Sequence, residues 1–415
     1  MGFLGVSKDV VIHESLKIIQ ELFTLLIKKG EEVLIVHDHD VDAAVSAGIF
    51  FRYLHGRVHV SIMDTLTYLL NKPEVCNIIY LGVNPHLVKA ERTLKVCRGS
   101  LGYNKVSGGK GIEITAPTIS SISATIIREF TPLTNHEKYM LLIASLSNKA
   151  PLILKTKLLD DLEKQLTNEL VNAGFLTFEK GLKIIGWKVS PPEYSLSSSL
   201  DPPFPGLLGD IDESKKFIEN TKFITLDLER KVKILREYIK SKVSKFNIPI
   251  KNFIDTLPIR RAEHMLTDIY EGIYSLTSLA DTQSINRLPF TLLITAYITA
   301  SLVNYKAAVN ALSSLFKDLS NNIKVSKKTA SRARKVTIVE LLADVGSHIA
   351  LCDYALKSLG LIGKSTIFSI DGEYVVSLLT TNVRYDELVR YGGEYRIKGC
   401  RVFFKDINKL SRVLA

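Results

Sequence analysis

The residues best suited to chemistry lie in one short segment, residues 37–42, which contains two histidines and three aspartates. The aspartates are Asp38, Asp40 and Asp42. At a separation of about 6 Å and an effective dielectric of about 20, each pair of these carboxylates repels by roughly 3 kcal/mol. Such a cluster needs a bound cation, a basic neighbour or full exposure to water. Which of the three applies decides whether the segment is a catalytic metal site.

The segments around this cluster have the pattern of an open α/β sheet. Apolar residues at helical spacing over residues 15–29 predict a helix that ends at Gly30. Residues 33–36 are expected to form a buried strand, and residues 43–54 the helix after it. The acidic cluster therefore follows the carboxyl end of a strand, where open α/β sheets usually bind ligands.

The next segments continue this alternation of strands and helices. Residues 57–63 and 77–81 are expected to be strands, with a short helix capped by Asp64 between them. The order β-α-β-α-β predicts a parallel sheet with right-handed crossovers, to which residues 94–96 are a candidate further strand. Residues 99–111 contain five glycines and are expected to form a loop. The spacing of these glycines does not fit a phosphate-binding loop, which excludes a P-loop nucleoside triphosphatase.

Length and composition indicate a multidomain globular protein. The chain has 415 residues, of which 46% are hydrophobic, and a net charge of +11. We expect two or three domains, and the positive charge suits a polyanionic partner such as nucleic acid. The sequence has neither a long apolar stretch nor a leader segment, so a soluble, intracellular protein without a membrane partner is expected. Four cysteines without a C-x-x-C pair indicate free thiols.

The second half of the chain changes character twice. Residues 190–209 are rich in proline and serine and are expected to form a loop, and residues 211–320 are expected to be mostly helical. Residues 321–335 carry six basic residues and no acidic one, which indicates either a solvated linker or a contact with backbone phosphates. A compact α/β module follows from residue 336, with a hairpin at Asp371-Gly372.

Three segments resemble the DHH phosphoesterase family. Asp38-His39-Asp40-Val41-Asp42-Ala43 is similar to the first motif, D-x-D-x-D-G, of RecJ-type single-strand exonucleases. Gly392-Gly393-Glu394-Tyr395-Arg396-Ile397-Lys398-Gly399 has the spacing of the second-domain signature G-G-H-x-x-A-A-G, and residues 203–207 resemble a loop of archaeal members. These segments follow the family's order over nearly the whole chain.

The resemblance implies an α/β fold with two lobes. Residues 1–190 would form a parallel-sheet DHH-type domain, and residues 191–320 a loop and helical part of the same lobe. Residues 321–335 would be the basic linker, and residues 336–415 a smaller α/β domain of the DHHA1 type.

The other catalytic motifs of the family are missing. Active members hold two manganese ions between four motifs. Tyr80 stands where the second motif has aspartate, Asn148 stands where the fourth has aspartate, and no Asp-His-His third motif occurs. The region expected to hold that motif offers only Cys97, Arg98 and Ser100. Because tyrosine has a pKa near 10 it is a poor ligand at neutral pH. The comparison implies no catalytic residue and a lost manganese site, with at most one weak cation at Asp40 and Asp42.

The best-known inactive RecJ-like proteins are replication subunits, among them eukaryotic CDC45, which works with GINS and the MCM ring. This chain resembles the archaeal counterpart. The resemblance implies a non-catalytic subunit that binds GINS, associates with the MCM helicase, contacts single-stranded DNA and is cytoplasmic and nucleoid-associated. The residues expected to meet DNA belong to the linker and the second-domain signature: Lys327, Lys328, Arg332, Arg334, Gly392, Gly393, Arg396 and Lys398.

Two other functions stay open. One is an active metal-dependent single-strand DNA exonuclease or phosphodiesterase with an atypical metal site. The other is a protein outside replication that binds nucleic acid or senses nucleotides. The acidic cluster itself has three possible roles. It is a relic of an ancestral site, it holds a single divalent ion through Asp40, Asp42 and His39, or it is a true catalytic site.

Overall fold

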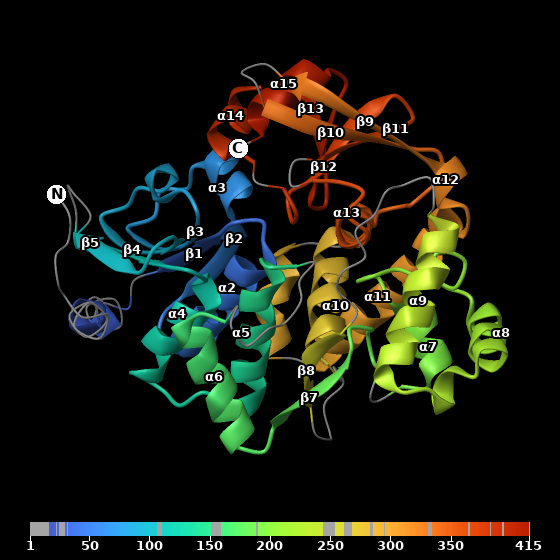
Figure 1. The fold of residues 1–415 in the computed structure, drawn as a ribbon. Coiled ribbons are helices and arrows are strands. Elements are labelled where there is room, and N and C mark those ends of the chain that lie inside the picture. Colours follow the sequence, from blue (N-terminus) through green and yellow to red (C-terminus); the bar gives the residue numbers. More distant parts are fainter. Residues whose placement is uncertain are drawn as a thin grey trace. The chain divides into compact units, whose positions relative to one another are not determined.

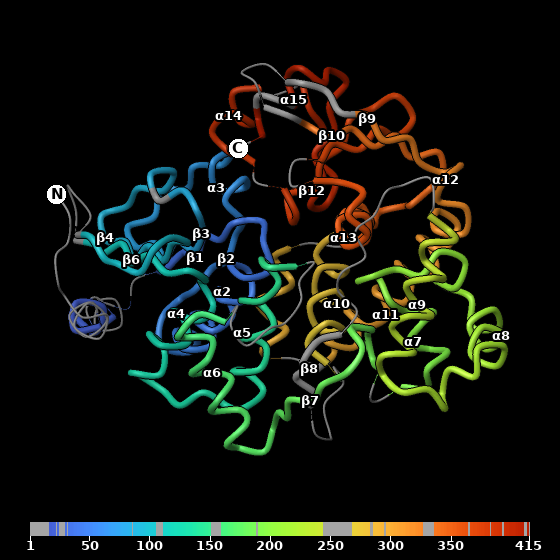
Figure 2. Tube along the Cα trace, in the orientation of Figure 1, coloured from blue at the N-terminus to red at the C-terminus, as the bar shows by residue number. Residues whose placement is uncertain are grey.

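The computed structural model describes residues 16–21, 23–24, 30, 32–105, 110–150, 159–187, 190–243, 254–260, 268–282, 285–293, 295–330, 334–363, 366–381, 383–391 and 394–414. Figure 1 shows the fold, and Figure 2 draws the remaining residues in grey. The chain divides into two compact units. Unit 1 comprises Met1–Asn148, Leu159–Ala173 and Ile285–Tyr297, and unit 2 comprises Lys149–Leu158, Gly174–Ser284 and Ile298–Ala415. This division differs from the four consecutive parts expected from the sequence.

Unit 1 is built on a sheet of six strands in the order β2-β1-β3-β4-β6-β5. Its strands are β1 (Val33–His37), β2 (Val60–Asp64), β3 (Asn77–Gly82), β4 (Arg92–Arg98), β5 (Gly102–Lys105) and β6 (Lys110–Ala116). All neighbours are parallel except β5, which pairs with β6 in the antiparallel sense. The expected parallel sheet is confirmed. Because β2 and β3 lie on opposite sides of β1, the chain reverses direction across the sheet beside the carboxyl end of β1, where α/β sheets bind ligands.

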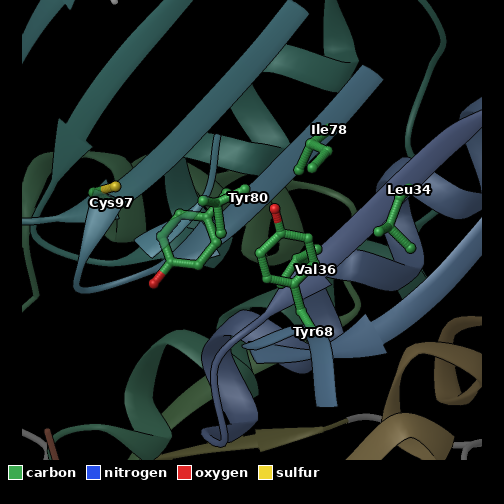
Figure 3. Packing of buried hydrophobic residues seen from close by; sticks show 7 residues of the cluster. Leu34, Val36, Tyr68, Ile78, Tyr80 and Cys97 are labelled. Carbon is green, nitrogen blue, oxygen red and sulfur yellow. The ribbon is translucent and has the colours of Figure 1, made fainter. Parts of the chain in front are cut away.

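The helices of unit 1 begin at short polar side chains. Asp40 caps α2 (Val41–Leu54) and Asp64 caps α3 (Thr65–Asn71), as the sequence predicts for Asp64. Further helices of this unit are η1 (Pro85–Leu87), α4 (Ile119–Arg128), α5 (Asn135–Ser147), α6 (Asp161–Asn172) and η4 (Ile285–Leu292), and residues 16–21 and 23–24 are helical as the sequence predicts. Figure 3 shows part of the core, in which side chains from β1, β3 and β4 form one cluster with Tyr68 of α3.

The segment η4 returns to unit 1 from far along the sequence and packs closely on α2. The contact is made at Gly48, where a Cβ atom would lie 2.1 Å from the carbonyl oxygen of Pro289. Only glycine allows the two backbones to come this close. The sequence gives no local sign of this contact.

Unit 2 contains a second six-stranded sheet, in the order β13-β14-β12-β11-β10-β9. Its strands are β9 (Ile323–Ala330), β10 (Arg334–Leu341), β11 (Thr366–Ile370), β12 (Glu373–Ser377), β13 (Tyr395–Lys398) and β14 (Arg401–Phe404). Only the pair β10 and β11 is parallel. The predicted hairpin is confirmed, because Asp371 and Gly372, both at positive φ, join β11 to β12.

The rest of unit 2 is mainly helical. Besides the ribbon of β7 (Leu176–Leu182) and β8 (Ile254–Arg260), its described elements are α7 (Pro192–Ser198), α8 (Ile211–Thr221), η3 (Phe223–Thr225), α9 (Leu228–Lys242), α10 (Ile269–Thr282), α11 (Thr295–Lys317, which starts in unit 1), α12 (Leu319–Asn322), α13 (Ile349–Ser358), α14 (Tyr385–Arg390) and α15 (Ile407–Val413). None of the helices within the described ranges combines the length and apolar character that crossing a bilayer requires.

The prediction of a linker at residues 321–335 is wrong. These residues contain β9 and the start of β10, paired in the antiparallel sense with Lys327 opposite Thr337 and Lys328 opposite Val336. The apolar residues Ile323 and Val325 alternate with polar ones, which is a strand pattern. The basic residues that suggested solvation are typical of strands at a sheet edge, where charge opposes pairing with other chains.

Three smaller predictions also need correction. The glycine-rich stretch 99–111 includes β5 and the start of β6, which pair in the antiparallel sense at the sheet edge, and its residues 106–109 lie outside the described residues. The helical block 211–320 contains the strand β8, which pairs with β7. The loop expected over residues 190–209 begins with the helix α7, whose first residue is a proline as helix starts favour.

Candidate functional site

Asp38 follows β1 directly, and its buried carboxylate is fully engaged by protein donors. Its Oδ1 accepts hydrogen bonds from the hydroxyls of Thr65 at 2.6 Å and Tyr80 at 3.0 Å. Its Oδ2 accepts one from the backbone N–H of Val83 at 2.8 Å. Burial raises the pKa of Asp38 to about 6, and the nearby Asp40 adds to this, against the opposing effect of the hydrogen bonds.

Tyr80, at the position of the family's second aspartate, lies in the core of β3 with its hydroxyl turned to Asp38. That hydroxyl also accepts a hydrogen bond from the backbone N–H of Asn84 at 3.2 Å. A Cβ on Gly82 would lie 2.3 Å from the tyrosine oxygen and 2.5 Å from Oδ2 of Asp38, so a larger residue here would displace one of these side chains. Where the family pattern has an aspartate that binds metal, this chain has a tyrosine whose hydroxyl donates a hydrogen bond to Asp38.

Asp42 is completely buried in the first turn of α2. Its carboxylate accepts backbone hydrogen bonds from Ile119 at 2.8 Å and Ser120 at 2.7 Å, which are the first N–H groups of α4. The positive end of that helix favours a negative charge here. Asn148, at the position of the family's fourth aspartate, donates its side-chain amide to the same carboxylate at 2.8 Å.

Arg98, the last residue of β4, lies between two of the carboxylates. Its Nη2 is 3.2 Å from Oδ1 of Asp40 and 3.4 Å from Oδ2 of Asp42. Burial lowers the pKa of Arg98, but the two carboxylates outweigh burial and raise it above its ordinary value. Burial raises the pKa of Asp42, and Arg98 opposes that rise. Of the three ways to balance the acidic cluster, the structure shows a basic neighbour.

A second polar group surrounds Asp64. His39 Nε2 lies 3.3 Å from Oδ1 of Asp64, and Asn286 donates to Oδ2 at 3.1 Å. Asn286 Oδ1 in turn lies 2.9 Å from Nε2 of His37. Burial lowers the pKa of His39 to about 4. Burial would raise the pKa of Asp64, but His39 and two hydrogen bonds from Thr67 outweigh it and lower the pKa to about 2.

Several of these residues are not identifiable as site residues from the sequence. Arg98 is noticed only as an occupant of the third-motif region, and its position against two carboxylates depends on the register of β4 beside β3. Asn286 reaches His37 across 249 positions, from a segment expected to be plain helix. The sequence feature that comes nearest to indicating such partners is a short polar residue beside a helix cap, such as Thr65 after Asp64.

The residues expected to meet DNA are spread over one sheet of unit 2. Lys327 and Lys328 belong to β9 and Arg334 begins β10, whereas Arg396 and Lys398 belong to β13 at the opposite edge. Five strand spacings separate those edges by about 24 Å. Arg396 is paired with Glu373 at 2.6 Å and lies 4.3 Å from the ring centroid of Phe403. Arg332, Gly392 and Gly393 lie outside the described residues.

The carboxylates of the acidic cluster therefore link neighbouring strands and helices of unit 1. Asp38 joins β1 to β3 and α3, while Asp42 joins α2 to α4, and Arg98 adds β4. In the described ranges, no three or more histidine, cysteine, aspartate or glutamate side chains are arranged to hold a metal ion.

The sequence matches no protein-family model and no curated protein. The fold, in contrast, is similar to the crystal structure of CDC45 from Entamoeba histolytica, with a TM-score of 0.60 over 94% of this chain and 95% of that chain. This chain has the fold of CDC45. The two share 11% sequence identity, so the similarity concerns the fold alone.

Two RecJ structures are also similar. RecJ from Thermus thermophilus in complex with Mn²⁺ aligns at a TM-score of 0.44 and 9% identity, over 97% of this chain and 52% of that chain. An exonuclease RecJ bound to manganese aligns at a TM-score of 0.41 and 11% identity, over 99% of this chain and 93% of that chain. The CDC45 fold confirms the α/β fold class expected from the resemblance, with a mostly parallel first sheet and a second, mixed sheet.

Proposed function

We propose that this chain is a non-catalytic replication subunit, a RecJ-like pseudo-nuclease that binds GINS, associates with the MCM helicase and contacts single-stranded DNA. The observation that carries the proposal is the position of Arg98 between Asp40 and Asp42. The CDC45 fold supports a replication role, and the resemblance of residues 38–43 to the first RecJ motif supports the ancestry.

The residues at the site do not fit the manganese pair of the family. A two-metal centre needs carboxylate oxygens from several strand ends that are open to the ions. Here Tyr80 and Asn148 donate hydrogen bonds to the carboxylates that remain, and Arg98 occupies the space beside two of them. A divalent ion about 4 Å from that guanidinium would be repelled by about 8 kcal/mol at an effective dielectric of 20. The same repulsion disfavours a single weak ion at Asp40 and Asp42.

Manganese is therefore expected to leave the wild-type protein unchanged. The melting temperature should be the same in Mn²⁺ and in EDTA, whereas Arg98→Ala should melt lower in EDTA and recover part of the loss in Mn²⁺, since its carboxylates are then unbalanced. Arg52→Ala, which breaks the ion pair with Glu137 in the same unit, is the matched control and should show no response to Mn²⁺. Saturable Mn²⁺ binding by the wild type, measured by calorimetry, would contradict the proposal.

A digestion of 5′-labelled single-stranded DNA with manganese separates the proposal from the enzyme alternative. We expect no cleavage above background from either the wild type or Asp40→Ala. Cleavage by the wild type that Asp40→Ala abolishes would show instead an active exonuclease with an atypical metal site.

The partner proposal is tested by capture from native lysate. We expect GINS to co-purify with this chain in near-stoichiometric amounts, and MCM with it. Recovery of neither would favour a nucleic-acid-binding role outside replication, and it would leave the fold and the metal result untouched.

A further inference from the structure

Helix α9 carries two lysines that lie above aromatic rings on one side of the helix. The Nζ of Lys231 is 5.4 Å from the ring centroid of Trp187 and 5.8 Å from that of Phe223. The Nζ of Lys242 is 5.7 Å from the ring centroid of Tyr238. Because Tyr238 and Lys242 follow Lys231 by seven and eleven positions, both lie within about 20° of it around the helix axis. The two lysines are about 16 Å apart along that axis.

The rings beneath these lysines form a continuous row. Trp187 contacts Phe223 with centroids 5.8 Å apart, Phe223 lies 5.9 Å from Phe217 of α8, and Phe217 lies 4.9 Å from Tyr238. We call these four residues the aromatic row. Phe223 is fully buried, whereas the other three residues are partly exposed. The row is therefore open to solvent in part at Trp187, Phe217 and Tyr238.

The neighbouring loop holds one end of the row in place. Tyr238 donates a hydrogen bond from its hydroxyl to the carbonyl oxygen of Pro205 at 2.8 Å. At Gly206, which has a φ of +88°, a Cβ would lie 3.1 Å from the tyrosine oxygen and 3.8 Å from Nζ of Lys242. The ring and the lysine are thus positioned by a close backbone approach.

Among the described residues, no acidic side chain forms an ion pair within 4 Å with Lys231 or Lys242, although burial and the charge of Glu213 raise the pKa of the neighbouring Tyr238. Asp227, at the start of α9, pairs with Arg230 at 3.3 Å, and Glu213 of α8 pairs with Lys216 at 2.7 Å. The acids within α9, Glu229 and Glu237, lie more than about 100° around the helix from Lys231. The positive charge beside the aromatic row is therefore available to an external anion.

We infer that the aromatic row and its two lysines form a binding surface for single-stranded nucleic acid. Lysines contact the backbone phosphates, while partly exposed rings stack on unpaired bases, and this combination is what single-strand binding proteins use. A duplex would offer the phosphates but keep its bases stacked inside. The inference rests on the proposed function only in its choice of DNA as the anion, and the surface is separate from the residues expected to meet DNA from the sequence.

Trp187 makes the test direct, because it is the only tryptophan in the chain. An oligothymidylate of about 30 nucleotides should quench its fluorescence saturably when added to the full-length protein. Lys231→Ala with Lys242→Ala should weaken binding about tenfold at 0.1 M salt and reduce the slope of log affinity against log salt by about 1.4, which corresponds to two lost phosphate contacts.

The matched control is Lys233→Ala with Lys240→Ala. These two lysines are exposed and belong to the same helix, but they lie on its opposite side. Replacing them removes the same amount of charge as the first pair of substitutions. Their loss should change affinity less than about threefold, since salt at 0.1 M screens charges beyond about 10 Å. Circular dichroism checks that both double variants fold.

Other results would overturn the inference. Equal losses in the two double variants would mean general attraction by net charge, and binding without a change in Trp187 fluorescence would place the contact elsewhere. Equal affinity for a duplex of the same length would exclude stacking. Equal quenching by polyglutamate would assign the surface to an acidic protein. None of these outcomes bears on the capture of GINS, so the two proposals fail separately.

Discussion

Replacement of Asp42 by alanine is expected to lower the free energy of unfolding by about 3–5 kcal/mol. The carboxylate is completely buried, and its loss would leave two backbone N–H groups of α4 and the amide of Asn148 without their acceptor, while Arg98 keeps its pair with Asp40. A buried donor that loses its acceptor costs about 1–3 kcal/mol, and these donors dominate the effect. Urea denaturation followed by circular dichroism measures it.

Asp40→Ala provides the comparison for Asp42. The Asp40 side chain is 13% exposed and caps α2 through the N–H of Ala43, so its loss should cost about 1 kcal/mol as a cap, plus a small term for Arg98. A cost at Asp42 no larger than that at Asp40 would show that the buried cluster is not what holds α2 to α4.

The stability of unit 1 should also depend on the protonation of Asp38. Burial raises its pKa in the folded protein from 3.8 to about 6. The folded state therefore holds the proton more tightly than the unfolded state, and the resulting stability is present below pH 4 and lost as the pH rises to about 6. A pKa difference of about two units corresponds to about 3 kcal/mol.

This titration is isolated by comparison with Asp38→Asn. His37 and His39, whose pKa values are lowered by burial, act in the opposite direction, since their contribution is lost as the pH falls below 6.5. Subtracting the profile of the variant removes most of that background. Free energies of unfolding from urea titrations at pH 4, 5, 6 and 7 should give a wild-type-minus-variant difference that falls with pH. A flat or rising difference would contradict the assignment.

The elements that depend on local pattern could be predicted from the sequence. The buried run before Asp38, the capping residue Asp64 and the Asp371-Gly372 turn each carry their signal within a few positions, and the structure has β1, α3 and the β11–β12 hairpin there. The strand β9 is mistaken for a linker when its lysines are weighed above the alternation of Ile323 and Val325. A high density of lysines indicates that a segment is solvated, but it does not exclude that the segment pairs as a strand at the edge of a sheet.

The candidate site could be predicted only in part. Asp38, Asp40 and Asp42 share one segment, so their proximity follows from the sequence. Arg98 and Asn286 come from elements whose approach depends on strand order and on the packing of η4 against α2, and no local pattern reports either. The resemblance to the DHH family indicated which ligands are absent, but not which group replaces their charge.

The return of η4 to unit 1 has a consequence for how the protein is made. A chain leaving the ribosome exposes β1, α2 and α5 long before Ile285–Tyr297, so unit 1 cannot complete its packing until residue 297 has emerged. Until then the surface of α2 around Gly48 has no cover, and His37 and Asp64 lack the amide of Asn286. About half of unit 2, Lys149–Leu158 and Gly174–Ser284, has been synthesised by then. Unit 1 therefore begins the sequence but completes its packing only after much of unit 2 has left the ribosome.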